Sequence, residues 1–456
     1  MTSQKESVHF IAIGGIGMSA LAKILLSMGY NVSGSDVKES PLVDKLKELG
    51  AHISLGHNAD NLPDDCNEVI YSSAIHEDNP ELLKAKAMGI PITHRGDLLA
   101  RFINSGKGLA VAGAHGKTTT SGMLSMILHA VEYHPNIVLG GILPCIDSNA
   151  LKDDSDLWVV EADESDRSFL KLHPYLTVIT NIEPEHMENY GTEENLKNAF
   201  LDFCNSSEKI IVCLDNNMVT EIAPNLNNGY YTYGLEHKAV DLTAREIKSK
   251  GLHTDSKIYY KGEYVAQLHL PIPGRHNVAN ALGAMYAAYI VGVPFGDSAA
   301  ALRNFTGTGR RFDVLYDDKG VLLVDDYAHH PTEVEATITA AKCCGYDRVI
   351  AVFQPHRYSR VRDLYKEFGK SFGEADVIVI DEIYSAWENR IEGISSQLIV
   401  DEISQKGLKP LYLKGSDAIY DYLKENYAKG DLILMMGAGD IRKTTDRFCA
   451  YLKGED

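Results

Sequence analysis

A glycine-rich turn between an apolar strand and an apolar helix constrains this chain more than any other feature. Residues 109–112 predict a short buried strand, and the apolar residues between Met123 and Leu128 predict the helix that follows. The turn reads Gly113-Ala114-His115-Gly116-Lys117-Thr118-Thr119-Thr120. In the order strand, loop, helix, the backbone N–H groups of the loop and the N-terminus of the helix attract one anion. The turn therefore predicts a phosphate-binding loop within an α/β domain.

Two side chains at the end of this loop suit a nucleoside triphosphate. Lys117 is placed to reach the outer phosphates, and Thr118 is placed to put its hydroxyl on Mg²⁺. The loop is shorter than the usual G-x-x-x-x-G-K-[ST] pattern, because Val111 stands where the first glycine belongs. An ordinary strand-to-helix turn with a solvated lysine is the alternative. Three consecutive threonines argue against it, since threonine is only a middling helix former away from the cap.

Length, charge and cysteine content set the broad class of the protein. At 456 residues the chain is too long for one core and predicts about three domains. No apolar run reaches the length of a membrane span, and no secretory signal is recognisable, so we expect a protein without membrane insertion. Seven scattered cysteines fit a reducing cytoplasm. A net charge of −19 argues against nucleic-acid binding through a basic surface.

The first hundred residues alternate strand and helix, with strands expected at 8–13, 32–35 and 68–71. Gly15, Gly17 and Ala20 fit the spacing G-x-G-x-x-A after the first strand, and Asp36 closes the second where a ribose-binding acid often falls. This pattern favours a diphosphate-bearing ligand without saying which one. Tight packing of a strand on a helix explains the glycines equally well.

Two acidic segments follow strands in the middle third of the chain. One strand at 157–160 leads into Glu161–Asp166, and another at 176–179 leads into 180–188, which contains His186. The carboxyl ends of parallel strands face the ligand crevice, so both segments are expected at the edge that carries the phosphate loop. Carboxylates there would hold Mg²⁺ against nucleotide phosphates. Solvated acidic loops and a structural histidine remain the alternative.

The remainder of the chain returns to alternating structure after a β excursion. Short alternating runs between 230 and 270 predict β-strands, and an alanine-rich helix is expected at about 277–291. Residues 307–311 read as a hinge with two arginines. A parallel sheet is expected from strands at 321–324, 349–353, 377–380 and 432–435, and histidines and arginines again follow strand ends.

Taken together and in order, these motifs resemble the Mur ligase family over nearly the whole chain. Each motif is modestly specific, and their order and spacing are highly specific. The matching segments are Gly14–Ser19, His115–Thr120, Glu161–Asp166, Thr180–Glu183, His186-Met187, Gly274–Asn277, Gly309–Phe312, Asp326-Tyr327, His329–Glu333 and Phe353–Tyr358.

The resemblance implies an α/β protein of three domains. They are a Rossmann-like domain for a UDP-sugar (1–104), a central P-loop ATPase with a mixed sheet (105–308) and a C-terminal Rossmann-like domain that binds an amino acid (309–456). It also implies a cytoplasmic reaction of peptidoglycan precursor synthesis, in which ATP phosphorylates the lactyl carboxylate of UDP-N-acetylmuramate and the amine of L-alanine attacks the acyl phosphate. ATP and two Mg²⁺ ions are the implied cofactors, and the implied assembly is a monomer or a weak homodimer.

Individual roles follow from the same resemblance. The implied catalytic residues are Lys117, Glu161, His186, Arg311, His356, Arg357 and Arg360. Those implied for ATP are Gly113, Ala114, His115, Gly116, Lys117, Thr118, Thr119, Asn280, Arg311 and Asp326. Thr118 and Glu161 would hold one Mg²⁺, and His186 a second. The UDP-sugar residues are Gly15, Ile16, Gly17, Met18, Asp36, Ser72 and Ser73. The amino-acid residues are Tyr327, His356, Arg357 and Arg360.

Other functions remain open at this point. Ala114 and Arg167 depart from the residues usual in the family, and Arg167 could change access to the sugar site. A sister ligase that attaches a tripeptide to the same sugar nucleotide during cell-wall recycling is the nearest alternative. A folate-glutamate ligase shares the ATPase but not the N-terminal domain. An NAD-dependent dehydrogenase leaves the phosphate loop unexplained, and a non-catalytic ATP-binding regulator leaves the C-terminal histidines and arginines without a role.

Overall fold

The computed structural model describes residues 6–386 and 388–455, which fall into two compact units. Unit 1 runs through Arg245 and adds Lys257–Leu268 and Ala279–Leu302. Unit 2 comprises Glu246–Ser256, His269–Val278 and the chain from Arg303 onward. In the described part of the chain, no helix is both long and apolar enough to cross a membrane.

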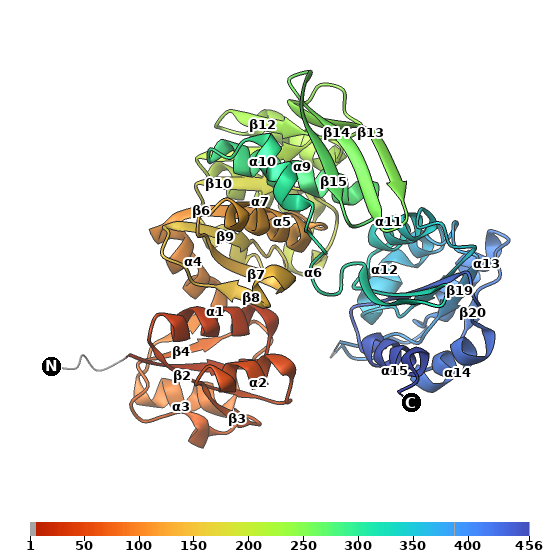
Figure 1. Cartoon of the computed structure of the whole chain (residues 1–456). Coiled ribbons are helices and arrows are strands. Elements are labelled where there is room, and N and C mark those ends of the chain that lie inside the picture. The colour runs from red at the N-terminus through yellow and green to blue at the C-terminus, as the bar shows by residue number, and fades with distance from the viewer. Residues whose placement is uncertain (1–5, 387, 456) are drawn as a thin grey trace. The chain divides into compact units, whose positions relative to one another are not determined.

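The first hundred residues of unit 1 form a parallel five-stranded sheet in the order β3-β2-β1-β4-β5 (Figure 1). Helices α1, α2 and α4 pack on one face of this sheet and α3 on the other. The strands are β1 (Ser7–Ile11), β2 (Asn31–Asp36), β3 (His52–Leu55), β4 (Glu68–Tyr71) and β5 (Ile92–His94). The helices are α1 (Ile16–Ser27), α2 (Pro41–Glu48), α3 (Pro80–Met88) and α4 (Arg95–Ser105), with a 3₁₀ turn η1 at Ala59–Asn61.

A ten-stranded mixed sheet follows, in the order β15-β14-β13-β12-β11-β10-β6-β9-β7-β8. Helix α5 packs on one face, while α1, α4 and α7 share a core with the other face, so the N-terminal sheet and this sheet are joined through α1 and α4. The strands are β6 (Lys107–Ala112), β7 (Asn136–Leu143), β8 (Ser148–Leu151), β9 (Leu157–Glu161), β10 (Leu176–Ile179), β11 (Lys209–Cys213), β12 (Tyr230–Tyr233), β13 (Leu242–Lys250), β14 (His253–Tyr260) and β15 (Glu263–Leu270). The helices are α5 (Lys117–Ala130), α6 (Met187–Tyr190), α7 (Glu193–Asn205), α8 (Asn217–Ile222), α9 (Arg275–Ile290) and α10 (Phe295–Leu302), with 3₁₀ turns η2 (Pro144–Ile146), η3 (Ser168–Lys171) and η4 (Ala223–Asn225).

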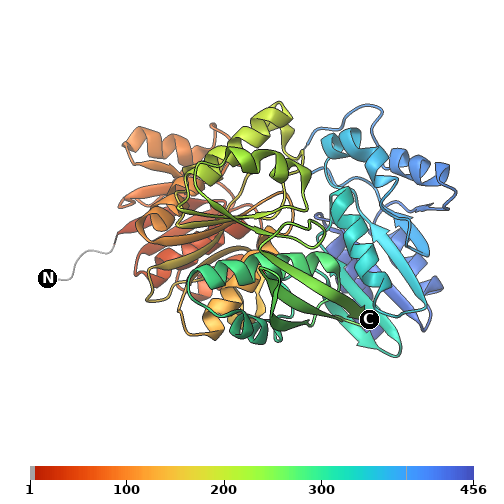
Figure 2. The same ribbon diagram turned by 90° about the horizontal axis from the view of Figure 1, so that it is seen from above.

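Unit 2 contains a six-stranded sheet in the order β16-β17-β21-β18-β19-β20, parallel except for β16. Helices α11, α12 and α13 cover one face, and α14 and α15 cover the other (Figures 1 and 2). The strands are β16 (Asp313–Asp318), β17 (Val321–Asp326), β18 (Arg348–Phe353), β19 (Val377–Ile380), β20 (Leu411–Tyr412) and β21 (Asp431–Met436). The helices are α11 (Pro331–Lys342), α12 (Tyr358–Phe368), α13 (Gln397–Gln405), α14 (Ser416–Asn426) and α15 (Ile441–Lys453).

The α/β class and the mixed central sheet are confirmed, and the predicted strands are present with ends shifted by one or two residues. Seven strands of the described chain were not predicted from the sequence, namely β3, β5, β7, β8, β11, β16 and β20. These are mostly short or marginal strands, and β16 is an antiparallel edge strand whose run Asp313–Asp318 carries three aspartates. Such a strand lacks the continuous apolar run that marks a buried parallel strand.

A fully buried carboxylate holds the N-terminal sheet to its surrounding loop. Glu81, in the first turn of α3, accepts hydrogen bonds from His9 Nε2 (3.1 Å) and Ser35 Oγ (2.6 Å) on two strands. It also accepts from Asn58 N (3.0 Å) and Asn61 Nδ2 (2.8 Å) in the η1 loop. Burial opposes the charged form, but these bonds outweigh it and lower the pKa of Glu81 below its ordinary value.

Replacing Glu81 with alanine is expected to lower the free energy of unfolding of this sheet by about 3–5 kcal/mol, because two buried donors, on His9 and Ser35, and two part-buried donors lose their acceptor. Hydrogen exchange of the β1 and β2 amides measures the loss locally. The pKa of Glu81 is lower in the folded state than in the unfolded state, so the ionised carboxylate stabilises the fold at pH values above the unfolded-state pKa. This stabilisation is lost as the pH falls through the folded-state pKa. The difference between wild type and variant should therefore hold above about pH 5 and shrink below about pH 4. Glu48→Ala, which removes an exposed glutamate, is the control. Equal hydrogen exchange in Glu81→Ala and Glu48→Ala would contradict the stabilising role of Glu81.

Candidate active site

The phosphate loop needs glycine at two positions because the backbone is left-handed and crowded there. Gly113 (φ 142°) and Gly116 (φ 81°) both lie in this region. A Cβ at Gly113 would collide with the Thr180 hydroxyl, and one at Gly116 would collide with the side-chain oxygen of Asn280. Helix α5 begins directly after Gly116 with no side-chain cap from the described residues, so no side chain at the cap position accepts from the N–H groups of its first turn. This is the geometry of an anion site at a helix N-terminus.

Asn181, at the end of β10, holds the loop in shape. Its Oδ1 accepts from His115 N (2.8 Å), and its Nδ2 donates to His115 O (2.9 Å). Thr180 donates to the same carbonyl through its hydroxyl (2.6 Å). The ring of His115 lies 3.3 Å from Glu183. The second acidic segment therefore lies beside the phosphate loop, as the sequence analysis predicted.

Lys117 is largely buried and paired with a carboxylate of the first acidic segment. Its Nζ lies 2.8 Å from Glu164 Oε1 and donates to the carbonyls of Gly113 (2.5 Å) and Ala114 (3.0 Å). Burial disfavours the ammonium, but Glu164 and then Glu161 raise the pKa of Lys117 above its ordinary value. Burial raises the pKa of Glu164 to about 7. The two carboxylates therefore keep the Lys117 side chain protonated beside the phosphate loop.

A hydroxyl and a carboxylate meet where a hard cation would bind. The Thr118 hydroxyl lies 2.9 and 3.1 Å from the two oxygens of Glu161, at the end of β9. Glu161 also accepts from Gly140 N (2.9 Å). Two oxygen donors beside a phosphate loop are the ligand types that Mg²⁺ prefers, so these residues fit the ion.

A second set of possible metal ligands includes His186. Ligand atoms of Glu164, Glu185 and His186 all lie within 4.8 Å of one another. One oxygen of Glu164, Oε2, is buried and has no hydrogen-bond partner among the described residues. A divalent cation would satisfy this oxygen, so the set fits a metal ion.

The turn after β1 forms a second exposed helix N-terminus. Gly14 N donates to Asp36 Oδ2 (2.8 Å), and this bond fixes the turn against β2. Gly15 and Ile16 are exposed at the start of α1, which has no side-chain cap from the described residues. The Met18 side chain, by contrast, is buried in the core of the sheet.

Arg95 joins this turn to the first acidic segment. Its Nη2 lies 2.7 Å from Asp163 and 2.9 Å from Asp166. The Nη1 side of the guanidinium lies against Gly17, where a Cβ would fall 3.4 Å away. Ser73 also donates to Asp166 (2.7 Å). Burial opposes ionisation, but Arg95 holds the pKa of Asp163 well below its usual range.

In unit 2, four rings stand in a row at the carboxyl ends of β17, β18 and β19. The ring centroids are 5.3 Å apart for Tyr327 and His329, 6.0 Å for His329 and His356, and 5.7 Å for His356 and Tyr384. Burial, followed by nearby positive groups, lowers the pKa of His356 to about 3, so its imidazole is neutral at pH 7. The first two pairs of rings meet edge to face and the third is stacked, so the row forms an aromatic surface beside several arginines.

Three of those arginines are fixed by partners within unit 2. Glu388 accepts from Arg357 Nε (2.6 Å) and thereby holds a residue whose φ is +73°. Arg360 Nη1 lies 3.3 Å from His356 Nδ1. Arg311 pairs with Glu333 (3.3 Å) and lies over the Tyr327 ring.

Two predicted nucleotide residues also have structural partners. Asn280 accepts from the Thr120 hydroxyl (3.3 Å) beside the phosphate loop. Asp326 is buried and accepts from Phe312 N and Ala328 N, both at 2.7 Å. Burial raises the pKa of Asp326 to about 6.

Several residues of these clusters were missed by the sequence analysis. Arg95 directly follows β5, a short strand that was not predicted. Its position at the end of a strand is the signal that could have identified it as a candidate site residue. Tyr384 and Glu388 lie on the loop after β19, where no motif marks them.

Three family models match successive parts of the chain. Residues 7–107 match the model described as Mur ligase family, catalytic domain; residues 111–288 match the Mur ligase middle domain; and residues 310–439 match the Mur ligase, glutamate ligase domain.

Curated relatives and solved structures agree with these models. A UDP-N-acetylmuramate–L-alanine ligase of Carboxydothermus hydrogenoformans is 45% identical over 96% of this chain and 95% of its own. One of Geotalea daltonii is 40% identical over 99% of both chains. The crystal structure of the UDP-N-acetylmuramate-alanine ligase of Thermotoga maritima aligns with a TM-score of 0.85 and 28% identity, covering 99% of this chain and 100% of that one.

Proposed function

The chain belongs to the Mur ligase family, and we infer from this premise that it is an ATP-dependent ligase that joins L-alanine to UDP-N-acetylmuramate in peptidoglycan precursor synthesis. The structural observation that carries the inference is the acidic segment Glu161–Asp166. Its carboxylates contact the phosphate loop through Lys117 and Thr118, and the N-terminal turn through Arg95. One segment therefore contacts two sites of the kind that bind phosphate groups. This arrangement suits an enzyme that phosphorylates a nucleotide-linked substrate.

The reaction has two chemical steps. A carboxylate does not react with an amine until one of its oxygens becomes a leaving group, so ATP first transfers its γ-phosphoryl group to the lactyl carboxylate. The L-alanine amine then attacks the acyl phosphate carbon, and phosphate leaves from the tetrahedral intermediate. Negative charge develops in both steps, and preorganised cationic and N–H groups stabilise it.

We propose that the phosphate loop, residues 113–119, binds the ATP phosphates. Lys117, already charged and held by Glu164, neutralises the β- and γ-phosphates and the phosphoryl group in transfer. We further propose that Thr118 and Glu161 hold one Mg²⁺ and His186 a second. When bound, such ions neutralise phosphate charge.

We propose that the N-terminal turn binds the diphosphate of the UDP-sugar. Gly15, Ile16 and Gly17 present backbone at the start of α1, and Asp36 fixes the turn. Ser73 and its neighbour Ser72 lie on the adjoining loop after β4. Because Met18 is buried, its contribution is through the backbone.

We propose that unit 2 binds L-alanine through Tyr327, His356, Arg357 and Arg360. The arginines supply the positive charge that an amino-acid carboxylate requires, and the neutral imidazole of His356 adds no charge that would repel the ammonium group. Arg311, Asp326 and Asn280 are proposed nucleotide residues.

We also propose that the enzyme acts in the cytoplasm, where its nucleotide substrates are made, and that it is a monomer or weak homodimer. The proposed domains are 1–104, 105–308 and 309–456. The three matching family models end at 107, 288 and 439, close to these boundaries.

Phosphate release from ATP, measured with each substrate omitted in turn, tests the function. Turnover is expected only when UDP-N-acetylmuramate, L-alanine and Mg²⁺ are all present. The tripeptide L-alanyl-γ-D-glutamyl-meso-diaminopimelate is the matched alternative acceptor. Preference for it over L-alanine would replace the proposal with the recycling reaction, and release without an acceptor would contradict both.

A further inference from the structure

The loop after β19 forms one side of the proposed L-alanine site. Tyr384 stacks on His356 with ring planes 17° apart. Its backbone is fixed on both sides, since Tyr384 N donates to Pro355 O (2.8 Å) and Arg357 N donates to Tyr384 O (2.9 Å). The ring is therefore held in a defined position relative to the imidazole.

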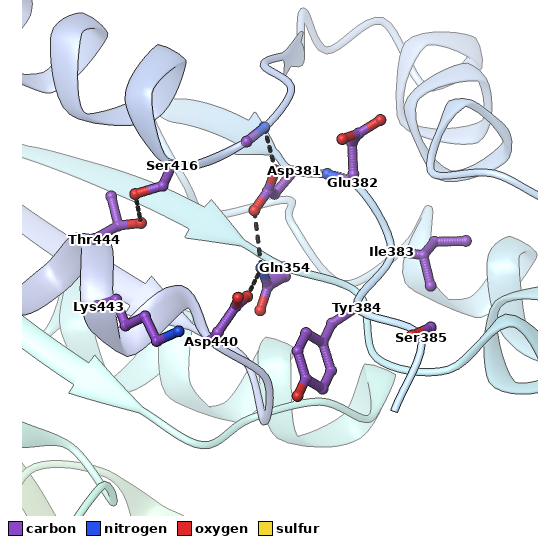
Figure 3. Close-up of a pocket in the computed structure, with 11 residues that line it drawn as sticks. Gln354, Asp381, Glu382, Ile383, Tyr384, Ser385, Ser416, Asp440, Lys443 and Thr444 are labelled. Carbon is purple, nitrogen blue, oxygen red and sulfur yellow. Dashed lines mark hydrogen bonds between the residues drawn. The ribbon is translucent and has the colours of Figure 1, made fainter. Parts of the chain in front are cut away.

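A cavity of about 340 Å³ lies beside the same tyrosine (Figure 3). Figure 3 shows the Tyr384 ring near Asp440, with Ser416 and Thr444 at the opposite end. At roughly 30 Å³ per water molecule, the cavity has room for about ten waters, and therefore for a whole amino-acid side chain. Its lining residues are Gln354, Asp381, Glu382, Ile383, Tyr384, Ser385, Gly415, Ser416, Asp440, Lys443 and Thr444.

Tyr384 is the residue common to the cavity and the ring row. It lines the cavity and contacts His356, whereas His356, Arg357 and Arg360 are absent from the lining. The side chain also packs against Gly439, where a Cβ would fall 2.6 Å from Tyr384 Cγ. The tyrosine therefore separates the proposed acceptor site from space large enough for a bulkier substrate.

We propose that Tyr384 determines acceptor specificity: its ring closes the His356 site off from the neighbouring cavity and so limits the acceptor to small α-amino acids. This inference rests on the proposed function, in which His356, Arg357 and Arg360 hold L-alanine. A substrate with a longer side chain meets the ring, whose movement is limited by the anchored backbone, by the stacking on His356 and by the close approach of Gly439. Tyr384 is a specificity-determining and positioning residue, since it acts through steric exclusion and through the orientation of His356.

Steady-state kinetics of Tyr384→Ala test the proposal with L-alanine, L-2-aminobutyrate, L-valine and L-leucine. The ratio of kcat/KM for L-valine to that for L-alanine is expected to rise by about tenfold or more, because the cavity then accepts the extra methyl groups. KM for L-alanine should rise more than kcat falls, since His356, a residue of the proposed acceptor site, loses the ring that orients it. Tyr384→Phe retains the ring and should restore the wild-type preference.

Two further variants keep the result interpretable. Tyr384→Leu shortens the side chain while keeping it apolar, and it should relax the preference even if the alanine variant does not fold. Tyr412→Ala removes a tyrosine that lines a different cavity in unit 2, and its preference should match wild type within about twofold.

An unchanged valine-to-alanine ratio in folded Tyr384→Ala or Tyr384→Leu would overturn the inference while leaving the ligase function intact. A wild-type enzyme that does not use L-alanine would instead overturn the proposed function. The two failures are therefore distinguishable in the same assay.

Discussion

Replacing Lys117 with alanine is expected to lower kcat by roughly 10³-fold, because one preorganised cation is lost where transition-state charge develops. The ammonium is held beside the loop by the carbonyls of Gly113 and Ala114 and by Glu164, so it is positioned in advance and exchanges only one of these three acceptors for a phosphate oxygen. The KM for L-alanine should change little, since the loss is confined to phosphoryl transfer. Single-turnover phosphate release measures the effect directly.

Loss of structure is a separate outcome that must be excluded for this variant. The substitution leaves Glu164 buried without its ammonium, but its pKa is already raised to about 7, so it becomes protonated at modest cost. Near-wild-type thermal unfolding is expected. Lys197→Ala removes a lysine paired with Glu194 and Glu221 at the surface of the same unit and should retain activity within about twofold. A folded Lys117→Ala enzyme with wild-type turnover would contradict the role.

Glu161→Ala is expected to lower kcat by roughly 10²–10³-fold at ordinary Mg²⁺ concentrations, since it removes the carboxylate opposite Thr118. Raising the Mg²⁺ concentration should recover part of the loss, because the remaining oxygen donors still bind the ion weakly. The Mg²⁺ concentration for half-maximal activity is the measurement, and a shift of about tenfold or more is expected.

The matched control for this prediction is Glu194→Ala, which removes an exposed glutamate from the same unit. It should leave the Mg²⁺ dependence unchanged. An equal fall in activity of Glu161→Ala at every Mg²⁺ concentration would argue that Glu161 acts only by holding Thr118 and Gly140.

The phosphate loop was predictable because its whole signal is local. Gly113, Gly116, Lys117 and Thr118 lie within six residues, and their spacing alone specifies the turn. The edge on which Glu161 falls was also predictable, since parallel strands end together.

Other parts of the site depend on contacts between distant segments and were not predictable. Arg95 pairs with Asp163, 68 positions away, and nothing near either residue marks the other as its partner. Glu388 fixes Arg357 from an irregular loop, and neither periodicity nor a turn signal identifies it. Resemblance supplied His356 but not Tyr384, because a ring that acts by shape leaves no charge pattern.

The antiparallel strand β16 shows the same limit in the fold. Its partner β17 begins with a continuous apolar run and was predicted, whereas β16 has aspartates at both ends and bulges between Val314 and Tyr316. Edge strands are free to carry such residues because only one side is paired. Their sequences are therefore weak predictors of strand structure.

The segment Glu161–Asp166 is tied at three points, to Thr118, Lys117 and Arg95, within six residues. Its length is consequently as constrained as its composition. One inserted residue could satisfy the first tie or the last but not all three, so homologous chains should tolerate insertions on either side of this run and none inside it. A substitution in this segment is therefore expected to disturb both the phosphate loop and the N-terminal turn.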